Sequence, residues 1–168
     1  MEASNFEKLL LKTAFCCMAS DGHIDQREVD TIEDLCAASD MFSELKLHNE
    51  VNSLVKEINN NGKQFIQLYL DTLDNSELTE TEEITLIEFA LKIINADELL
   101  EYSEIKFFKN IRHRLKISDE NILLHHPSIE DFLEEDIKDD SYLETITAHF
   151  IETVELPQFD IITLTKNE

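Results

Sequence analysis

The sequence predicts an all-α fold, a helical bundle of about seven helices. Apolar residues recur at the three- and four-residue spacing of helices along residues 1–118, and helix-capping residues stand before several of these stretches. The chain of 168 residues contains only two Gly and two Pro, far fewer turn residues than an all-β protein needs. With 42% apolar residues, it can also bury a core.

The expected helices follow one another closely. Caps are expected at Ser4, Asp25, Ser43 and Thr79, for helices that end near residues 19, 36, 58 and 94, and a further helix is expected over residues 65–73. The helix from residue 79 is apolar nearly all round, which places it in the centre of the bundle. A sixth helix is expected over about 101–115, with its basic side chains exposed: Lys106, Lys109, Arg112 and Arg114.

The acidic composition changes along the chain. Residues 119–168 contain 14 acidic and two basic residues, a net charge of −12 out of −23 for the whole chain. We therefore divide the chain into a helical domain, residues 1–118, and an acidic C-terminal extension, residues 119–168, partly docked on it. In the extension we expect a short helix from Ser128, a docked helix over about 142–154 and a buried extended strand after Pro157. The alternative is a solvated tail that becomes ordered only on a partner.

The charge and the motifs exclude several classes of function. A net charge of −23 repels phosphate backbones, so we expect no nucleic-acid partner, and it favours cations or basic proteins. No apolar run reaches the roughly 20 residues that span a bilayer, and the N-terminus lacks the features of a signal peptide, so we expect a cytoplasmic protein. There is no glycine-rich phosphate loop, nucleophile motif or His-Glu-x-x-His motif, which argues against an enzyme and identifies no small-molecule substrate.

Two segments 76 residues apart share one pattern of acidic residues. Residues 21–28 and 97–104 both contain an acid, two other residues, an aliphatic residue, an acid, two other residues and an acid. The six acids are Asp21, Asp25, Glu28, Asp97, Glu101 and Glu104. The repeat predicts two pseudo-symmetric helix-loop-helix units.

These acids are candidate ligands for a divalent cation. Hard cations such as calcium and magnesium take clustered carboxylate and carbonyl oxygens. The first loop also matches the second half of an EF-hand loop, but Cys17 and Ala19 occupy the first and third ligand positions, which argues against a true EF-hand. Helix capping alone also explains acids at a helix N-terminus, although it requires neither both flanking acids nor the aliphatic residue.

The segments 14–28 and 93–104, with the pattern Ala-x-Asp-Gly-x-Ile-x-x-x-Glu in the first copy, resemble the TerB-like family. This family comprises the tellurite-resistance B proteins and the related N-terminal domain of membrane-anchored DnaJ-type co-chaperones. The resemblance covers residues 6–118. It implies an all-helical bundle with pseudo-twofold symmetry, no established catalytic activity, divalent metal at the acidic loops, and a role in tellurite or other stress responses or in phage defence at the inner membrane. Glu98 stands where the first copy has Gly22, a departure from the pattern.

Two hypotheses for function follow. The first is a non-enzymatic module that binds a divalent cation, a protein partner or both through its paired acidic loops. The second is a metal-free acidic adaptor that recruits a basic or membrane-associated partner, which would place the protein at the periphery of the inner membrane.

The remaining reactive residues have simpler interpretations. Cys16 and Cys17 are adjacent, and a vicinal thiol pair can bind soft metals or metalloids, but with Cys36 they also suit a buried apolar segment. His125 and His126 form the only pair of histidines in the sequence, and we expect a surface turn there rather than a zinc site.

Overall fold

The protein is all-α in the part of the chain that the structure describes. The computed structural model describes residues 5–20, 22, 24–37, 47–96, 102–127, 150–151 and 156–162. These ranges contain no strand and seven helices: α1 (Asn5–Ala19), α2 (Gln26–Ala37), α3 (Leu47–Asn61), α4 (Lys63–Asp74), α5 (Glu80–Ile94), α6 (Tyr102–Arg112) and α7 (Asp119–His125). The predicted fold class is therefore confirmed. The caps expected at Ser4 and Ser43 and the helix expected from Ser128 lie outside the described residues.

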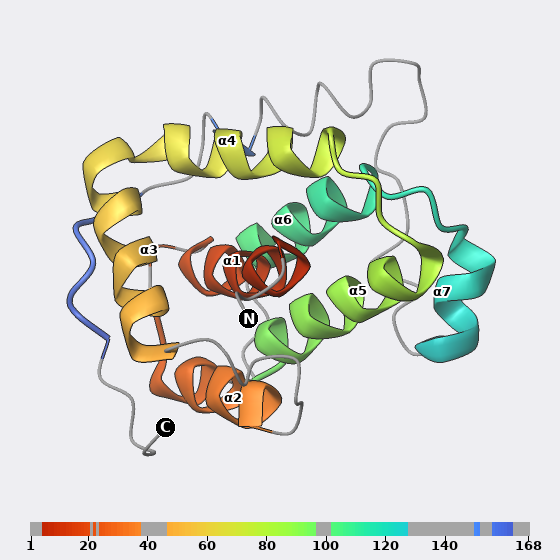
Figure 1. The fold of residues 1–168 in the computed structure, drawn as a ribbon, viewed down its shortest axis with the longest axis horizontal. Helices are drawn as coiled ribbons and strands as arrows, with labels where there is room; N and C mark the ends of the chain where they lie inside the picture. Colours follow the sequence, from red (N-terminus) through yellow and green to blue (C-terminus); the bar gives the residue numbers. More distant parts are fainter. Residues whose placement is uncertain are drawn as a thin grey trace.

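Helix α1 occupies the centre of the bundle. It contacts each of α2 to α6, which surround it in Figure 1, and its main partner is α5. The sequence explains this position, because the second half of α1 is apolar or small on every face and is buried from Thr13 to Ala19. Helix α5, which we expected at the centre, is also largely buried. The core is therefore built around the α1–α5 pair.

Two predicted helix caps are present in the structure. At the start of α5, Thr79 Oγ1 accepts a hydrogen bond from the Glu82 amide at 3.2 Å, and Glu82 Oε1 accepts one from the Thr79 amide at 3.0 Å. At the start of α2, the Asp25 amide donates to Glu28 Oε2 at 3.1 Å. In both cases a side chain satisfies an amide that the helix leaves without a partner.

The turn between α3 and α4 depends on a glycine. Gly62 has φ +58°, and its amide donates to the carbonyl oxygen of Ile58 at 2.7 Å. A Cβ added at Gly62 would meet no atom within 4 Å, so the requirement is for the left-handed backbone and not for space. Because this turn begins only at Gly62, α3 continues to Asn61, beyond its expected end.

The basic side chains of the sixth helix are not all exposed, and that expectation was wrong. Lys109 is buried, and Arg112 reaches from α6 to Asp119 of α7, with Nε 2.8 Å from Oδ1. The side chain of Arg114 is 5% exposed and pairs with Asp74 at 3.2 Å. Long basic side chains lie along apolar neighbours while their charged ends find acidic partners. In this way the cations around α6 connect it to α4 and α7.

The C-terminal part of the chain packs on the bundle. The ring of Phe150 is fully buried, 5.3 Å from the ring of Phe107 in α6. Residues 156–162 lie along the outer side of α3 (Figure 1), where they form no strand, because their hydrogen bonds go to side chains. Ile162 is buried there as expected, but Ile161 is 77% exposed. Of the helix expected over about 142–154, only residues 150–151 are described, and the strand expected after Pro157 is absent from residues 156–162.

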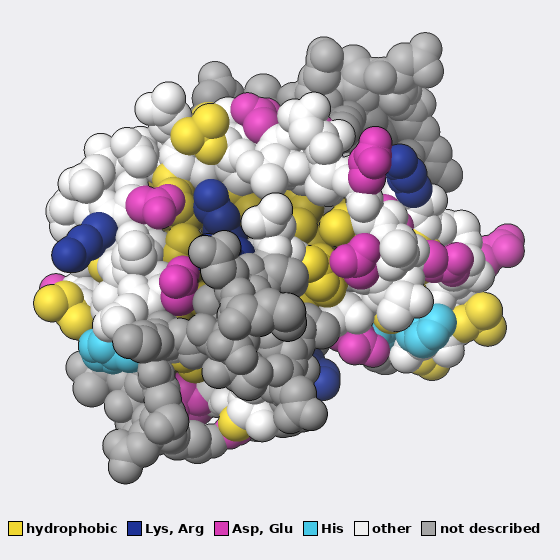
Figure 2. Space-filling view, viewed as in Figure 1, with side chains coloured by type: hydrophobic (Ala, Val, Ile, Leu, Met, Phe, Trp, Pro, Cys, Tyr) yellow, Lys and Arg dark blue, Asp and Glu magenta, His cyan; other side chains and the backbone are white. Residues whose placement is uncertain are grey.

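The charged side chains on the face shown in Figure 2 are mostly acidic. Acidic side chains outnumber basic ones on this face and are spread over it, with several near α7. None of the described helices is long and apolar enough to cross a membrane.

Candidate functional site

Three of the six candidate acids lie in the described part of the chain. Asp25 precedes α2, Glu28 is the third residue of α2 and Glu104 is the third residue of α6. The other three, Asp21, Asp97 and Glu101, lie outside the described residues.

Asp25 caps helix α2. Its Oδ1 atom accepts hydrogen bonds from the Arg27 amide at 2.8 Å and from Arg27 Nε at 3.1 Å. Its own carbonyl oxygen accepts from the amides of Glu28 and Val29. A carboxylate in this position complements the positive end of the helix dipole. The structure thus gives Asp25 a capping role.

Glu28 and Glu104 both lie inside the protein. Both are almost completely buried, although they come from loops 76 residues apart in the sequence. Burial is the main cause that raises the pKa of the Cys17 thiol, and Cys16, Glu104 and Glu28 raise it further. Both carboxylates are therefore close enough to act on one thiol near the end of α1. The two loops place their last acid in the same region.

The described residues alone do not form a metal centre. Within the described ranges, no group of three or more His, Cys, Asp or Glu side chains is arranged to hold a metal ion. A cation at the acidic loops would therefore need ligands from Asp21, Asp97 or Glu101, in addition to Glu28 and Glu104.

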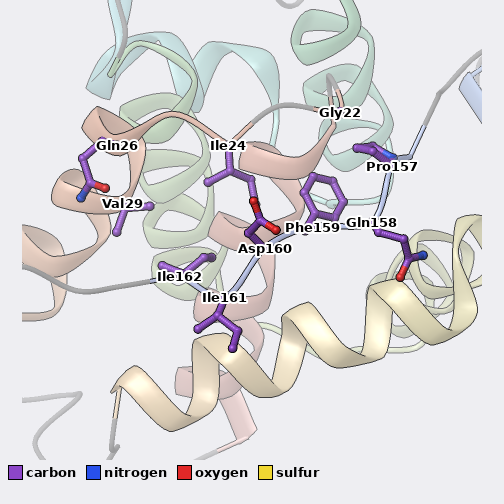
Figure 3. A pocket seen from close by; sticks show the side chains of 10 residues that line it. All are labelled: Gly22, Ile24, Gln26, Val29, Pro157, Gln158, Phe159, Asp160, Ile161 and Ile162. Carbon is purple, nitrogen blue, oxygen red and sulfur yellow. The ribbon is translucent and has the colours of Figure 1, made fainter.

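A pocket lies between the first acidic loop and the docked C-terminal segment. It has a volume of about 390 Å³, and Figure 3 shows its lining residues. Gly22 and Ile24 contribute from the loop, Gln26 and Val29 from α2, and residues 157–162 from the segment. Asp160 therefore brings a further carboxylate to the side of the first loop. The segment and the loop border one cavity, although more than 130 positions separate them in the sequence.

Comparison with known proteins gives no relative. No family model, no curated protein and no solved structure matches the chain.

The three cysteines are buried and free. Burial raises the pKa of the Cys36 thiol to about 12 and raises the pKa values of Cys16 and Cys17 well above the ordinary 9.0. Because the thiolate is the reactive form, these thiols are protonated at neutral pH as well as hidden from solvent. Their environment is that of small core residues.

Labelling with a thiol reagent tests this interpretation. At pH 8, the native protein is expected to react with Ellman's reagent at least about tenfold more slowly than the protein in 6 M guanidinium chloride, because burial and a raised pKa both suppress the thiolate. Because pH 7 to pH 9 lies far below the raised pKa values, the native rate should stay low over this range, although the small thiolate fraction grows about tenfold with each pH unit. Rapid reaction of Cys16 or Cys17 in the native protein would contradict their burial and would support direct chemistry at the vicinal pair.

The two histidines lie at the end of α7. His125 is exposed, and its Nδ1 is 2.9 Å from the carbonyl oxygen of Asn121. His126 ends the helix, and its Nε2 is 3.5 Å from Glu88 of α5. Their position at a helix end agrees with the expected surface turn.

Sequence reasoning missed the residues that hold the segment beside the first loop. These are Asn52 and Asn59 of α3, whose side chains bond to the backbone of Ile162 and Phe159. A signal was present, since the two asparagines are seven positions apart and share one face of the helix. An asparagine on a helix surface more often faces water, so this signal alone does not identify a binding surface.

Proposed function

We propose that this protein is a non-enzymatic, TerB-like binding module of a stress response, such as the response to tellurite, or of a defence system. Its paired acidic loops hold a divalent cation and thereby present a surface to a protein partner. The observation that carries this proposal is the burial of Glu28 and Glu104, whose charges both raise the pKa of the Cys17 thiol. The last acid of each loop is therefore buried, and both act on the end of α1.

The chemistry of a hard cation fits this arrangement. Carboxylates brought together in an interior of low polarity are costly unless positive charge or hydrogen bonds compensate them. A calcium or magnesium ion supplies that charge and takes oxygen ligands. The acids Asp21, Asp97 and Glu101 complete the ligand set in this proposal.

Internal symmetry supports the same proposal. We infer that α1 with α2 and α5 with α6 are two related helix-loop-helix units. In each unit the buried glutamate is the third residue of the second helix, and the first helices, α1 and α5, pack on one another. A cation site shared by the two loops requires that the equivalent loops of these units lie together.

Calorimetric and thermal-shift titrations test the proposal. Wild-type protein is titrated with calcium, magnesium, manganese or zinc and is expected to bind at least one of these cations saturably. The variants Asp21→Ala and Glu28→Gln are each expected to weaken this binding at least about tenfold, because each removes a charged ligand. Glu28→Gln keeps an oxygen that can accept from the Asp25 amide, and circular dichroism checks that the helices remain. The control is Glu77→Gln, which makes the same change at an exposed residue outside the loops.

A second candidate function is a metal-free adaptor that recruits a basic or membrane-associated protein. One observation favours it: the carboxylate of Asp25 already bonds to Arg27 and to the N-terminus of α2. If none of the four cations produces heat or a thermal shift, the cation is removed from the proposal and the adaptor is the better description.

A further inference from the structure

The outer side of α3 holds an extended stretch of chain by two asparagine side chains. Asn59 Nδ2 donates to the carbonyl oxygen of Phe159 at 2.9 Å, and Asn59 Oδ1 accepts from the Phe159 amide at 2.8 Å. Asn52 makes the same pair of bonds to the carbonyl oxygen and the amide of Ile162, at 2.9 and 2.8 Å. Each side chain therefore satisfies both main-chain groups of one residue, as a neighbouring strand would.

The spacing of the two asparagines matches the spacing of an extended chain. Seven residues of an α-helix rise about 10.5 Å, at about 1.5 Å per residue. Three residues of an extended chain, from Phe159 to Ile162, cover about 10 Å at about 3.3 Å per residue. Asparagines two turns apart on α3 therefore meet every third residue of a chain that runs in the opposite direction. The asparagine bonds that follow from this geometry fix the register through the main chain of the segment.

Beside Leu156, which packs partly buried at the start of the segment, and Gln158, whose Nε2 donates to the carbonyl oxygen of Asn59 at 3.2 Å, the side chains contribute at two apolar positions. Ile162 is buried, and Phe159 is partly buried against the core. Between them, Asp160 and Ile161 are exposed, Ile161 by 77%. The asparagine amides bond to main-chain atoms alone and so do not distinguish side chains. The surface accordingly selects an extended conformation with an apolar residue at the first and fourth positions.

We propose that this face of α3, together with the adjoining part of α2, is a docking site for an extended segment of a partner protein with two apolar residues three positions apart. Residues 156–162 occupy the site as an internal ligand. Main-chain hydrogen bonds supply affinity and two apolar positions supply specificity, as when an extended peptide adds to the edge of a sheet.

The space beside the internal ligand favours a different protein over a second copy as the partner. The pocket of about 390 Å³ between the segment and α2 borders Ile24 and Val29 (Figure 3). A segment with bulkier side chains can fill this space and gain apolar contacts. A second copy would bring the same residues and leave the space open. The internal ligand is tethered, and a short tether gives an effective concentration in the millimolar range, so an incoming segment must bind more tightly than the internal one.

A fluorescent peptide with the sequence of residues 156–162 tests the site on the full chain. In the variant Phe159→Ala/Ile162→Ala both apolar anchors are removed and both asparagines remain, so the internal segment no longer competes. We expect saturable binding to this variant by fluorescence anisotropy, and binding at least about tenfold weaker to the wild type, where the tethered segment competes. Adding Asn52→Ala and Asn59→Ala to the variant should weaken binding at least about tenfold. Adding Asn60→Ala, an exposed asparagine of the same helix, should leave it unchanged.

Modified peptides test whether the main chain is recognised. Methylation of the peptide nitrogen that corresponds to Phe159 removes a donated hydrogen bond and should reduce binding, whereas methylation at the position of Asp160 should reduce it much less.

If circular dichroism shows that the double variant is unfolded, Ile162→Ala alone replaces it and should show intermediate affinity. The proposal is overturned if the peptide does not bind a folded released variant, or if the asparagine replacements have no effect. It is equally overturned if light scattering shows a wild-type dimer that the asparagine replacements dissociate, since the occupant is then a second copy. None of these outcomes depends on a cation. A result that contradicts the docking site therefore leaves the proposed cation binding untouched, and the reverse also holds.

Discussion

Replacement of Phe150 by alanine is expected to lower the free energy of unfolding of the whole protein by about 3–5 kcal/mol, the usual cost of removing a large buried aromatic side chain. Phe150 has no exposed surface, and its ring lies 5.3 Å from that of Phe107, which in turn lies 6.0 Å from that of Tyr69. The three rings connect the C-terminal region, α6 and α4. Urea unfolding followed by circular dichroism measures the effect.

The control for this prediction is Ile161→Ala, which removes an apolar side chain that is 77% exposed and should change stability by less than about 0.5 kcal/mol. A single unfolding transition in both variants is expected, because the Phe150 ring belongs to the same core as α4 and α6. A loss of less than about 1 kcal/mol in Phe150→Ala would show that the C-terminal region contributes little to that core. A separate early transition would show that it unfolds as an independent unit.

Helix positions could be predicted because the information that specifies them is local. The apolar spacing of α1 and the capping box of Thr79 and Glu82 involve residues within one or two turns of each other. The environment of Arg114 could not be predicted in this way, because it depends on Asp74, 40 positions away. Local spacing places such a cation on a polar face, and only the packing of α4 against α6 shows that it is covered.

In the candidate site, too, features set by local spacing could be predicted and features set by packing could not. Asp25 was predicted as the cap of its helix, and its amide donates a hydrogen bond to Glu28 Oε2 in the structure. The burial of Glu28 together with Glu104 is a property of the packed bundle. The asparagine contacts join positions 52 and 162, which are 110 residues apart, and no short-range pattern reports such a pairing. The apolar pattern after Pro157 predicted that Ile162 is buried, but it did not show that Ile161 is exposed.

Glu83 makes long-range hydrogen bonds that its position in the sequence does not indicate. In the sequence it is one of three acids in the first turn of α5, where any of them complements the helix dipole. In the structure it is 5% exposed, and its two carboxylate oxygens accept hydrogen bonds from the consecutive amides of Lys116 and Ile117, at 3.0 and 2.8 Å. One side chain of α5 therefore holds the turn between α6 and α7.

Glu83→Ala is expected to destabilise the protein by about 3–5 kcal/mol. It removes two hydrogen bonds to a charged acceptor, each worth about 1.5–3 kcal/mol, and leaves the amides of the exposed Lys116 and the buried Ile117 without their acceptor. Glu83→Gln keeps one acceptor oxygen and loses the charge, so it should cost roughly half as much. Urea unfolding of both variants, beside Glu77→Ala at an exposed position, measures these differences.

The stability of Glu83→Gln relative to that of Glu83→Ala separates the hydrogen bonds from side-chain packing, because alanine removes both. If the carboxylate acts mainly through its two acceptors, glutamine must fall between the wild type and alanine. A glutamine variant as stable as the wild type would show that neither the charge nor the second acceptor matters, and that one acceptor oxygen and the volume of the side chain suffice. A glutamine variant as unstable as alanine would show that the turn at Lys116 and Ile117 requires both oxygens at once, since an amide NH₂ group placed against a backbone N–H leaves two donors facing each other.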